Sequence, residues 1–161
     1  MKRIQLKRKE RDYYIKALLK EVTLGELMTS PAISIKEDAL FSDVAEKFKR
    51  LGIRHLPVVD EKNKVVGIIT ERDLHKVCSP RKLEDGTWYY DKEMLDGFIL
   101  SSVMTPKPVT MHPEQNIGEA LLLMARNKYG CIPIVDKQGV LCGVITQMDY
   151  LYVAAQILEE V

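Results

Sequence analysis

The pattern of apolar and polar positions along this chain occurs twice. When the sequence is shifted by 76 residues, residues 28–74 align with residues 104–150 without a gap, and ten of the 47 paired positions are identical. Because self-similarity at a fixed spacing is typical of repeated structural units, the sequence predicts two copies of one unit. The identical pairs are Met28/Met104, Thr29/Thr105, Arg50/Arg126, Pro57/Pro133, Val59/Val135, Asp60/Asp136, Gly67/Gly143, Ile69/Ile145, Thr70/Thr146 and Asp73/Asp149.

Each copy predicts the element order β-α-β-β-α. A short extended segment opens the unit, at residues 32–35 in the first copy and at residues 109–111 in the second. Apolar residues then recur at the spacing of an amphipathic helix, and in the second copy Asn116 is placed to cap it. These apolar residues are Phe41, Val44, Phe48 and Leu51 in the first copy and Ile117, Ala120, Leu121 and Met124 in the second.

Two short apolar runs follow each helix and predict a pair of strands. The runs are rich in β-branched residues, too short for helices, and separated by turn-forming residues. A second helix is expected to begin at Thr70 in the first copy and at Thr146 in the second. Because the runs are apolar at successive positions, both faces of the sheet should be covered, which one copy can hardly do alone. The runs are residues 56–59, 65–69, 132–135 and 140–145.

The fold class that follows is α/β, with two β-α-β-β-α repeats packed by pseudo-twofold symmetry into one globule. We place the first repeat at residues 23–78 and the second at residues 97–161, where residues 151–161 extend the last helix. Residues 1–22 predict a basic helix with a partial apolar face, and residues 79–96 form an insertion with an aromatic cluster that a partner protein could bind. The apolar face is Tyr14, Ile15, Leu18, Leu19 and Val22, and the aromatic cluster is Trp88, Tyr89 and Tyr90.

Composition places the chain among ordinary globular proteins. Its 161 residues are 46% hydrophobic and 29% charged, which excludes wholesale disorder. No apolar run approaches the roughly 20 residues of a membrane span, and we expect no membrane association. The three cysteines are an odd number without a C-x-x-C pair, which favours reduced thiols and a cytoplasmic location over disulfides or a zinc site.

The charge of the chain is unevenly distributed. Residues 1–22 carry eight Lys or Arg and three Asp or Glu residues, a balance of +5, whereas the rest carries 16 against 20, a balance of −4. Such a basic arm could attract nucleic acid or an acidic partner, but a solvated helix face has the same composition. Nucleic-acid binding is the weaker interpretation because no aromatic residues interleave with the basic run before Tyr13 and Tyr14.

A Thr-x-x-Asp motif stands where a strand passes into a helix in both copies, at Thr70/Asp73 and at Thr146/Asp149. One interpretation is a capping box, with threonine at the N-cap and aspartate in the first turn. The other is ligand binding: the helix N-terminus and the threonine hydroxyl can bond to a phosphate, and the aspartate can accept both hydroxyls of a ribose. Cap and ligand contact can coexist at the threonine, and the residues leave both interpretations open.

The doubled pattern MT-x-P/K-x-(I/V)…(L/I)-P-(V/I)-V-D…G-(I/V)-I-T-x-x-D resembles the cystathionine-β-synthase-type (CBS) domain, which normally occurs as tandem pairs. The resemblance covers residues 23–78 and 97–154. It implies a regulatory module, rather than an enzyme, that binds AMP, ADP, ATP or S-adenosylmethionine in clefts between the two copies and requires no other cofactor. It also implies a homodimer and a regulated protein partner.

The resemblance further implies a set of ligand-binding residues, and the two copies are not equally equipped. Residues 53–55 (IRH) correspond to residues 129–131 (YGC), where family members often place basic residues that meet nucleotide phosphates. Arg72 of the first Thr-x-x-Asp motif corresponds to Met148. The first motif is therefore expected to suit a phosphorylated nucleotide. The second would hold a less charged adenosine compound, borrow Arg54 and His55 across the pseudo-twofold axis, or stay empty. The candidate set is Thr29, Ile33, Ile53, Arg54, His55, Thr70, Arg72, Asp73, Thr105, Val109, Gly130, Cys131, Thr146 and Asp149.

Catalytic and metal chemistry find little support in the sequence. No G-x-G-x-x-G, Walker-type or G-x-S-x-G motif occurs, and apart from His75 and Cys78 no histidine has a partner at ligand spacing. Two alternatives to a ligand sensor remain. One is a structural or protein-interaction module in which the Thr-x-x-Asp motifs are only caps. The other is an enzyme that uses Cys131 or His55.

Overall fold

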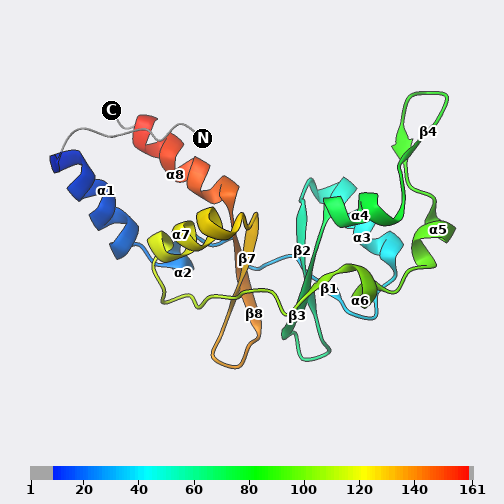
Figure 1. Ribbon diagram of the computed structural model, residues 1–161, viewed down its shortest axis with the longest axis horizontal. Helices are drawn as coiled ribbons and strands as arrows, with labels where there is room; N and C mark the ends of the chain where they lie inside the picture. The colour runs from blue at the N-terminus through cyan, green and yellow to red at the C-terminus, as the bar shows by residue number, and fades with distance from the viewer. Residues whose placement is uncertain (1–8, 160–161) are drawn as a thin grey trace.

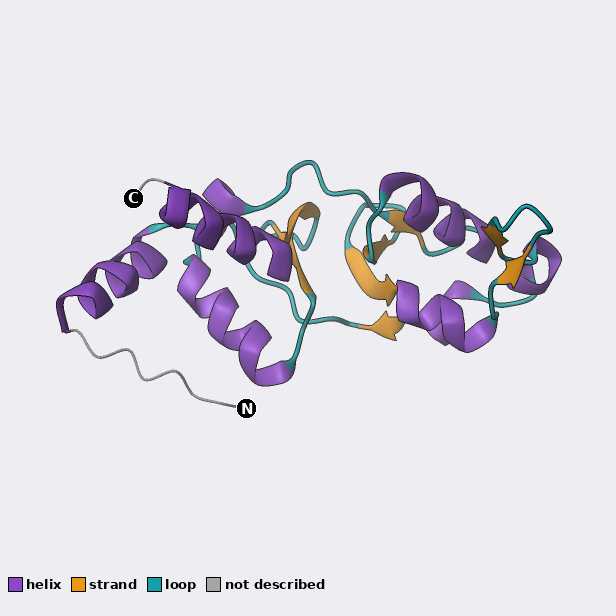
Figure 2. Cartoon of the chain, turned by 90° about the horizontal axis from the view of Figure 1, so that it is seen from above, coloured by secondary structure: helices purple, strands orange, loops and turns teal. Residues whose placement is uncertain are grey.

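The two copies fold into two lobes in the computed structural model, which describes residues 9–159 (Figure 1). In each lobe a β-hairpin faces the other lobe and helices pack on its outer side (Figures 1 and 2). The first lobe contains β1 (Ile35–Lys36), α3 (Phe41–Leu51), β2 (His55–Val59), β3 (Val65–Thr70) and α4 (Glu71–Val77). The second contains α7 (Ile117–Asn127), β7 (Cys131–Val135), β8 (Leu141–Thr146) and α8 (Gln147–Glu159).

The two hairpins have the same strand register. In the first lobe β2 pairs antiparallel with β3, and His55 lies opposite Thr70. In the second lobe β7 pairs antiparallel with β8, and Cys131 lies opposite Thr146, each 76 residues further along the chain. An irregularity near the open end of each hairpin also falls at equivalent residues. The predicted α/β fold with two repeats is confirmed.

The extended segment that opens each copy is shorter than the sequence predicts. In the first copy β1 begins only at the last residue of the expected segment 32–35, and it pairs in parallel with β2. In the second copy the prediction of a strand at residues 109–111 is wrong, because a single parallel bridge joins Met111 to β7. Lys107 takes a positive φ of 46° and Pro108 has no N–H to donate. The backbone therefore joins the sheet of the second lobe only at Met111.

Each lobe has a hydrophobic core between its hairpin and its helices. The predicted helical positions Phe41, Val44 and Phe48 are buried, whereas Leu51 is 39% exposed at the end of α3. The first core is Ile35, Phe41, Val44, Ala45, Phe48, Leu56, Val58, Ile69, Leu74, Cys78, Leu95 and Leu100. The second core is Leu24, Met111, Ile117, Ala120, Met124, Ile132, Ile134 and Ile145.

A short helix that precedes each copy crosses to the opposite lobe (Figure 1). Helix α2 (Leu24–Leu27) precedes the first copy, yet Leu24 is fully buried in the core of the second lobe. Helix α6 (Leu100–Val103) precedes the second copy, and Leu100 is buried in the core of the first lobe. Because Leu24 and Leu100 are 76 residues apart, this exchange follows the same pseudo-twofold symmetry as the repeats.

Backbone hydrogen bonds continue each exchanged segment onto the other hairpin. Strand β6 (Thr105–Pro106) follows α6 and pairs antiparallel with β3, and Thr29 bridges to β8 in the equivalent way. The turns of the two hairpins also touch: Leu141 N–H donates to the carbonyl of Asn63 at 3.0 Å, and a reciprocal bond of 3.2 Å returns from the first lobe. The two lobes are therefore tied into one folded unit.

Glycine in the middle of β3 and of β8 allows the crossing segments to lie close to the hairpins. The Met104 side chain lies against Gly67, and the Met28 side chain lies against Gly143. A Cβ at either glycine would overlap the sulfur of its methionine. These two contacts account for two of the identical pairs in the repeat, because each methionine needs the missing side chain of its glycine.

The insertion packs on the first lobe. Leu95 is 1% exposed and belongs to the first core. The carboxylate of Asp96 accepts hydrogen bonds from the backbone N–H and the hydroxyl of Ser42, at 2.9 and 3.0 Å. It thereby caps α3, whose own N-cap residue, Leu40, has no polar side chain. The elements of the insertion are β4 (Arg81–Lys82), β5 (Trp88–Tyr89) and α5 (Lys92–Asp96).

The three aromatic residues of the insertion differ in their exposure. Trp88 is 57% exposed and Tyr89 is 36% exposed, whereas Tyr90 is half-buried with its hydroxyl 3.3 Å from Nδ1 of His75. Tyr90 thus contacts α4 of the first lobe. Binding of a partner protein at this cluster stays a prediction, and Trp88 is the side chain with the most accessible surface for it.

Helix α1 (Lys9–Glu21) docks on the second lobe only through its C-terminal end (Figure 1). Leu19 and Val22 pack against the second core. A Cβ at Gly118 of α7 would lie 2.8 Å from the carbonyl oxygen of Leu19, so this glycine permits the close approach of the two helices. The rest of the expected apolar face does not pack on the body, and the part of the predicted helix before Lys9 lies outside the described residues. The exposed residues are Tyr14, Ile15 and Leu18.

Helix α8 begins directly after Thr146, as the sequence predicts, and runs to Glu159. None of its residues is buried. Within residues 9–159, no helix is both long enough and apolar enough to cross a membrane. The large apolar side chains that α8 exposes are Met148, Leu151, Tyr152, Ile157 and Leu158.

Candidate functional site

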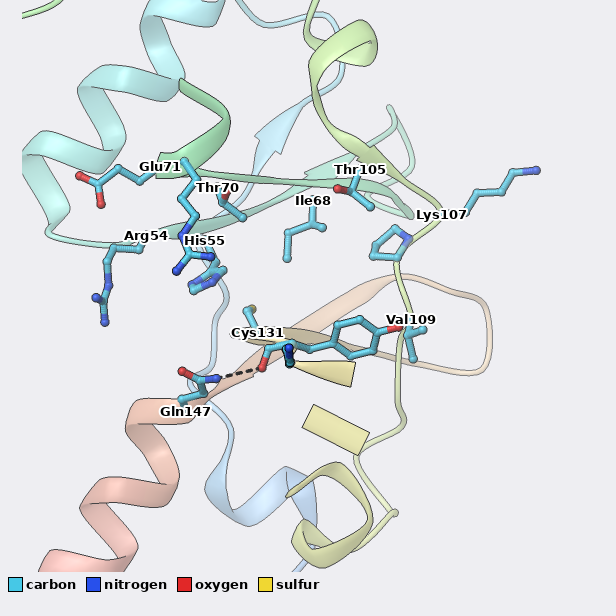
Figure 3. A pocket seen from close by; sticks show the side chains of 15 residues that line it. Arg54, His55, Ile68, Thr70, Glu71, Thr105, Lys107, Val109, Cys131 and Gln147 are labelled. Atoms are coloured by element: carbon cyan, nitrogen blue, oxygen red, sulfur yellow. Dashed lines mark hydrogen bonds between the residues drawn. The ribbon is translucent and has the colours of Figure 1, made fainter. Parts of the chain in front are cut away.

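A cavity of about 580 Å³ lies between the lobes, beside the point where β3 passes into α4 (Figure 3). It is bounded by the neighbouring ends of β2 and β3, by the segment that crosses from α6 along β3, and by the turn between α7 and β7. Both copies therefore contribute to one space. The lining residues are Arg54, His55, Ile68, Thr70, Glu71, Arg72, Thr105, Lys107, Pro108, Val109, Lys128, Tyr129, Gly130, Cys131 and Gln147.

The cavity brings together eight of the fourteen candidate residues. Because the segment before the second copy crosses to the first lobe, Thr105 and Val109 line the same space as Thr70, which belongs to the other copy. The eight are Arg54, His55, Thr70, Arg72, Thr105, Val109, Gly130 and Cys131. The six that do not line it are Thr29, Ile33, Ile53, Asp73, Thr146 and Asp149. A ligand-binding role for each of the fourteen stays a prediction.

Two lysines of the cavity were missed by the sequence reasoning. Lys107 reaches it because β6 pairs with β3, and its exposed side chain extends outward in Figure 3. Lys128 reaches it from the turn that leads from α7 to β7. The signal that could have found both is a break in the repeat, since the 76-residue shift pairs them with Pro31 and Gly52.

The carboxylate of Asp73 holds the start of α4. One oxygen accepts hydrogen bonds from the backbone N–H and the hydroxyl of Thr70, at 2.9 and 2.7 Å, and the other accepts from Nζ of Lys76 at 2.6 Å. Burial would raise the pKa of Asp73, but the hydrogen bonds from Lys76 and Thr70 outweigh it and hold the pKa below its ordinary value. Asp73 is therefore ionised at neutral pH, and both of its oxygens are engaged.

The second copy repeats this arrangement without a lysine partner. Asp149 accepts from the backbone N–H and the hydroxyl of Thr146, at 2.6 and 2.7 Å. The threonine–aspartate contacts expected of a cap thus occur in both copies. A ligand contact at either threonine remains compatible with them, because a hydroxyl that donates one hydrogen bond can still accept others.

His55 lies where the two copies meet. A Cβ built on Gly130 would overlap the ring nitrogen Nε2 of His55, so the absence of a side chain at Gly130 makes room for the imidazole. Burial, followed by the positive charges of Arg54 and Arg72, lowers the pKa of His55 below its ordinary value, while Asp73 opposes this shift weakly. The ring is therefore neutral at pH 7 and adds no charge to the cavity.

Cys131 is a poor candidate for a nucleophile. It is 8% exposed, and burial, with a smaller contribution from the charge of Asp149, raises the pKa of its thiol to about 12. Because the thiolate is the reactive form, almost none of Cys131 is reactive at neutral pH. The neutral His55 nearby offers no positive charge that would reverse the shift. Within residues 9–159, no group of three or more His, Cys, Asp or Glu side chains is placed to hold a metal ion.

The lining of the cavity is strongly basic. It includes four permanently positive side chains and one carboxylate, that of Glu71. All four cations are exposed, so their charged groups stand at the edge of the cavity rather than in its interior. A pocket of this size is typical of small-molecule sites, and this charge favours an anionic ligand. The cations are Arg54, Arg72, Lys107 and Lys128.

Comparisons with known proteins agree with the two-copy architecture. The CBS domain family matches residues 24–79 and 100–155, which is more than half of the chain. A CBS domain-containing protein of Dictyostelium discoideum is 32% identical over 142 residues, covering 88% of this chain and 97% of that protein.

Solved structures give the same picture. CBSX2 of Arabidopsis thaliana, determined in complex with AMP, is 25% identical with a TM-score of 0.69, covering 84% of this chain and 98% of that chain. The CBS domain pair of protein MJ0100, determined with 5′-methylthioadenosine and S-adenosylmethionine, is 22% identical with a TM-score of 0.68, covering 84% and 97%, and is similar in fold. From the doubled motif, the exchanged lobes and these matches, we conclude that the chain belongs to the CBS domain family.

Proposed function

We propose that this chain is a regulatory module, not an enzyme, that binds an adenosine-containing nucleotide in the cavity between its two copies. The observation that carries the proposal is the cavity itself, in which Thr70 of one copy meets Thr105 and Val109 of the other beside four cations. The AMP complex of the Arabidopsis relative supports the class of ligand, and the closed, high-pKa thiol of Cys131 argues against nucleophilic catalysis.

The contacts of Asp73 indicate how the site would accept a ribose. Both carboxylate oxygens are engaged, one by Thr70 and the other by Lys76. The Lys76 side chain is 71% exposed, so it can leave at little cost and free one oxygen for the ribose hydroxyls. Thr70 can keep its bond to Asp73 and accept a further hydrogen bond from the ligand.

The regulatory mechanism would be a shift between two arrangements of the lobes. A ligand that touches both copies stabilises the arrangement in which its contacts from both sides are made. That change would be transmitted to a regulated protein partner or to a second copy of the chain. A ligand with equal affinity for both arrangements would shift nothing, so the effective ligand must bind one of them better.

A thermal-denaturation screen of the full chain tests the proposed function. We expect AMP, ADP, ATP or S-adenosylmethionine to raise the melting temperature, because a ligand that binds only the folded state stabilises it. At one hundred times its dissociation constant the gain is about 2.7 kcal/mol, which for this chain length corresponds to about 5–10 °C.

Guanine nucleotides at the same concentrations are the matched control, since they carry the same phosphates on another base. No shift with any adenosine compound would contradict the proposal. It would favour the alternative of a structural or protein-interaction module, for which the complete threonine–aspartate contacts in both copies are the supporting observation.

We also propose that the chain is a homodimer that pairs through α8, and that it acts in the cytoplasm. Helix α8 has no buried residue, yet Leu151 is 60% exposed, Tyr152 is 63% exposed and Leu158 is 77% exposed. A second copy would remove this apolar surface from water. The free cysteines support a reducing compartment.

Light scattering is expected to give a mass of about twice the 18.4 kDa of one chain. Leu151→Ser should weaken the dimer and lower the mass at micromolar concentration. Leu83→Ser is the matched control, because Leu83 is 48% exposed in the insertion at the other end of the molecule (Figure 1). A monomeric wild-type protein would refute the proposed dimer. A dimer that neither variant weakens would refute α8 as its interface.

A further inference from the structure

The positive charge of the cavity is not shared by the position that the pseudo-twofold symmetry relates to it. Each of the four cations corresponds, 76 residues away, to an uncharged residue. The single carboxylate of the lining, Glu71, corresponds to the neutral Gln147. The pair of copies is thus symmetric in fold and one-sided in charge. The correspondences are Arg54 with Gly130, Arg72 with Met148, Lys107 with Pro31 and Lys128 with Gly52.

The backbone at Lys128 is a second, independent observation. Lys128 ends α7 with a left-handed φ of 60°, and Gly52 ends α3 with a φ of 63°. Glycine adopts this conformation without steric cost, whereas a residue with a Cβ does not. Lysine therefore gives the end of α7 nothing that glycine would not give at lower cost, and what it adds is a positive charge at the cavity.

We propose that the cavity binds a phosphorylated adenosine nucleotide, at one site per chain, and discriminates against S-adenosylmethionine and against adenosine without phosphate. This inference rests on the proposed function and specifies its ligand. The phosphates would lie toward Arg54, Arg72 and Lys128, while the base and the ribose would lie along the crossing segment and Thr70.

The electrostatic argument concerns the charge of the ligand. Phosphate oxygens accept strong charge-assisted hydrogen bonds from guanidinium and ammonium groups. S-adenosylmethionine carries a sulfonium and an ammonium group against one carboxylate, so its net positive charge is repelled by the same lining. Affinity should therefore rise from AMP to ADP to ATP. Because the four cations are exposed, salt should weaken nucleotide binding.

Isothermal titration of the full chain tests this inference, with ATP, ADP, AMP, adenosine and S-adenosylmethionine as the probes. We expect one nucleotide per chain, with ATP at least tenfold tighter than adenosine or S-adenosylmethionine. Lys128→Gly should lower the ATP affinity by about tenfold, the loss of one charge-assisted hydrogen bond. It should not lower the melting temperature, because glycine suits the left-handed backbone better. This combination separates a binding role from a structural one.

Arg72→Met provides a second variant, since methionine is the residue of the other copy, and it should also weaken ATP binding about tenfold. Arg126→Met is the matched control, because Arg126 is exposed on α7 and does not line the cavity. If S-adenosylmethionine or adenosine binds as tightly as ATP, if two nucleotides bind alike, or if both cavity variants behave like the control, the inference is overturned while the proposed function stands. If no adenosine compound binds, both fail.

Discussion

Leu24→Ala is expected to lower the free energy of unfolding by about 2–5 kcal/mol, the usual cost of truncating a fully buried leucine. Leu24 is 0% exposed and belongs to the second core, although it precedes the first copy in sequence. The loss should therefore come from a cavity inside the second lobe, which only a crossing segment can fill. Urea denaturation measured by circular dichroism gives the change.

Leu122→Ala is the matched control in the same lobe. Leu122 is 54% exposed on α7, so its truncation should change the free energy of unfolding by no more than about 0.5 kcal/mol. Leu100→Ala, the symmetry-related change, should cost as much as Leu24→Ala, because Leu100 is buried in the first core. If Leu24→Ala cost no more than Leu122→Ala, the segment would not cross, and the lobes would not be tied together as described.

The β-hairpins and the long helices could be predicted because their signals are local and doubled. β-Branched runs such as Val65–Thr70, interrupted by turn residues, can only be strands, and a 76-residue shift reproduces each of them. The cap of α7 was equally legible: Asn116 accepts from the backbone N–H of Glu119 at 2.9 Å, as its position in the sequence predicts.

The exchange of segments between the lobes was not legible, because it depends on which of two nearly identical hairpins a segment meets. The pattern around Leu24 and Leu100 says that both leucines are buried, but it carries no information about the lobe. Loop length and tertiary packing decide that choice. The expected strand at residues 109–111 failed for a related reason, since the pairing of β6 with β3 had already turned the backbone away at Lys107.

The candidate site was predictable only in so far as the repeat carries it. Motif positions such as Thr70 and Arg72 line the cavity, and the crossing places Thr105 beside them. Lys107 and Lys128 belong to no motif and reach the cavity through tertiary contacts. Comparing one copy with the other identifies them more directly than the motif does, because residues that fold alone requires recur in both copies and residues specific to one site do not.

Leu95→Ala is expected to destabilise the first lobe as strongly as Leu24→Ala destabilises the second, by about 2–5 kcal/mol. Leu95 lies in the insertion, outside the repeat, yet it is 1% exposed and belongs to the first core. Its neighbour Asp96 caps α3 through Ser42, so a loosened α5 would also release that cap. The insertion would then be a part of the core and not an appended loop.

The matched control is Met94→Ala, on the same short helix but 49% exposed, for which we expect a change of about 0.5 kcal/mol or less. Both variants are compared with the wild type by urea denaturation. Because Leu95 contacts the core between α3 and the hairpin, its loss should lower the midpoint of a single transition and not create an early, partial one. A separate transition confined to the insertion, with the rest unchanged, would show that the first lobe folds without it.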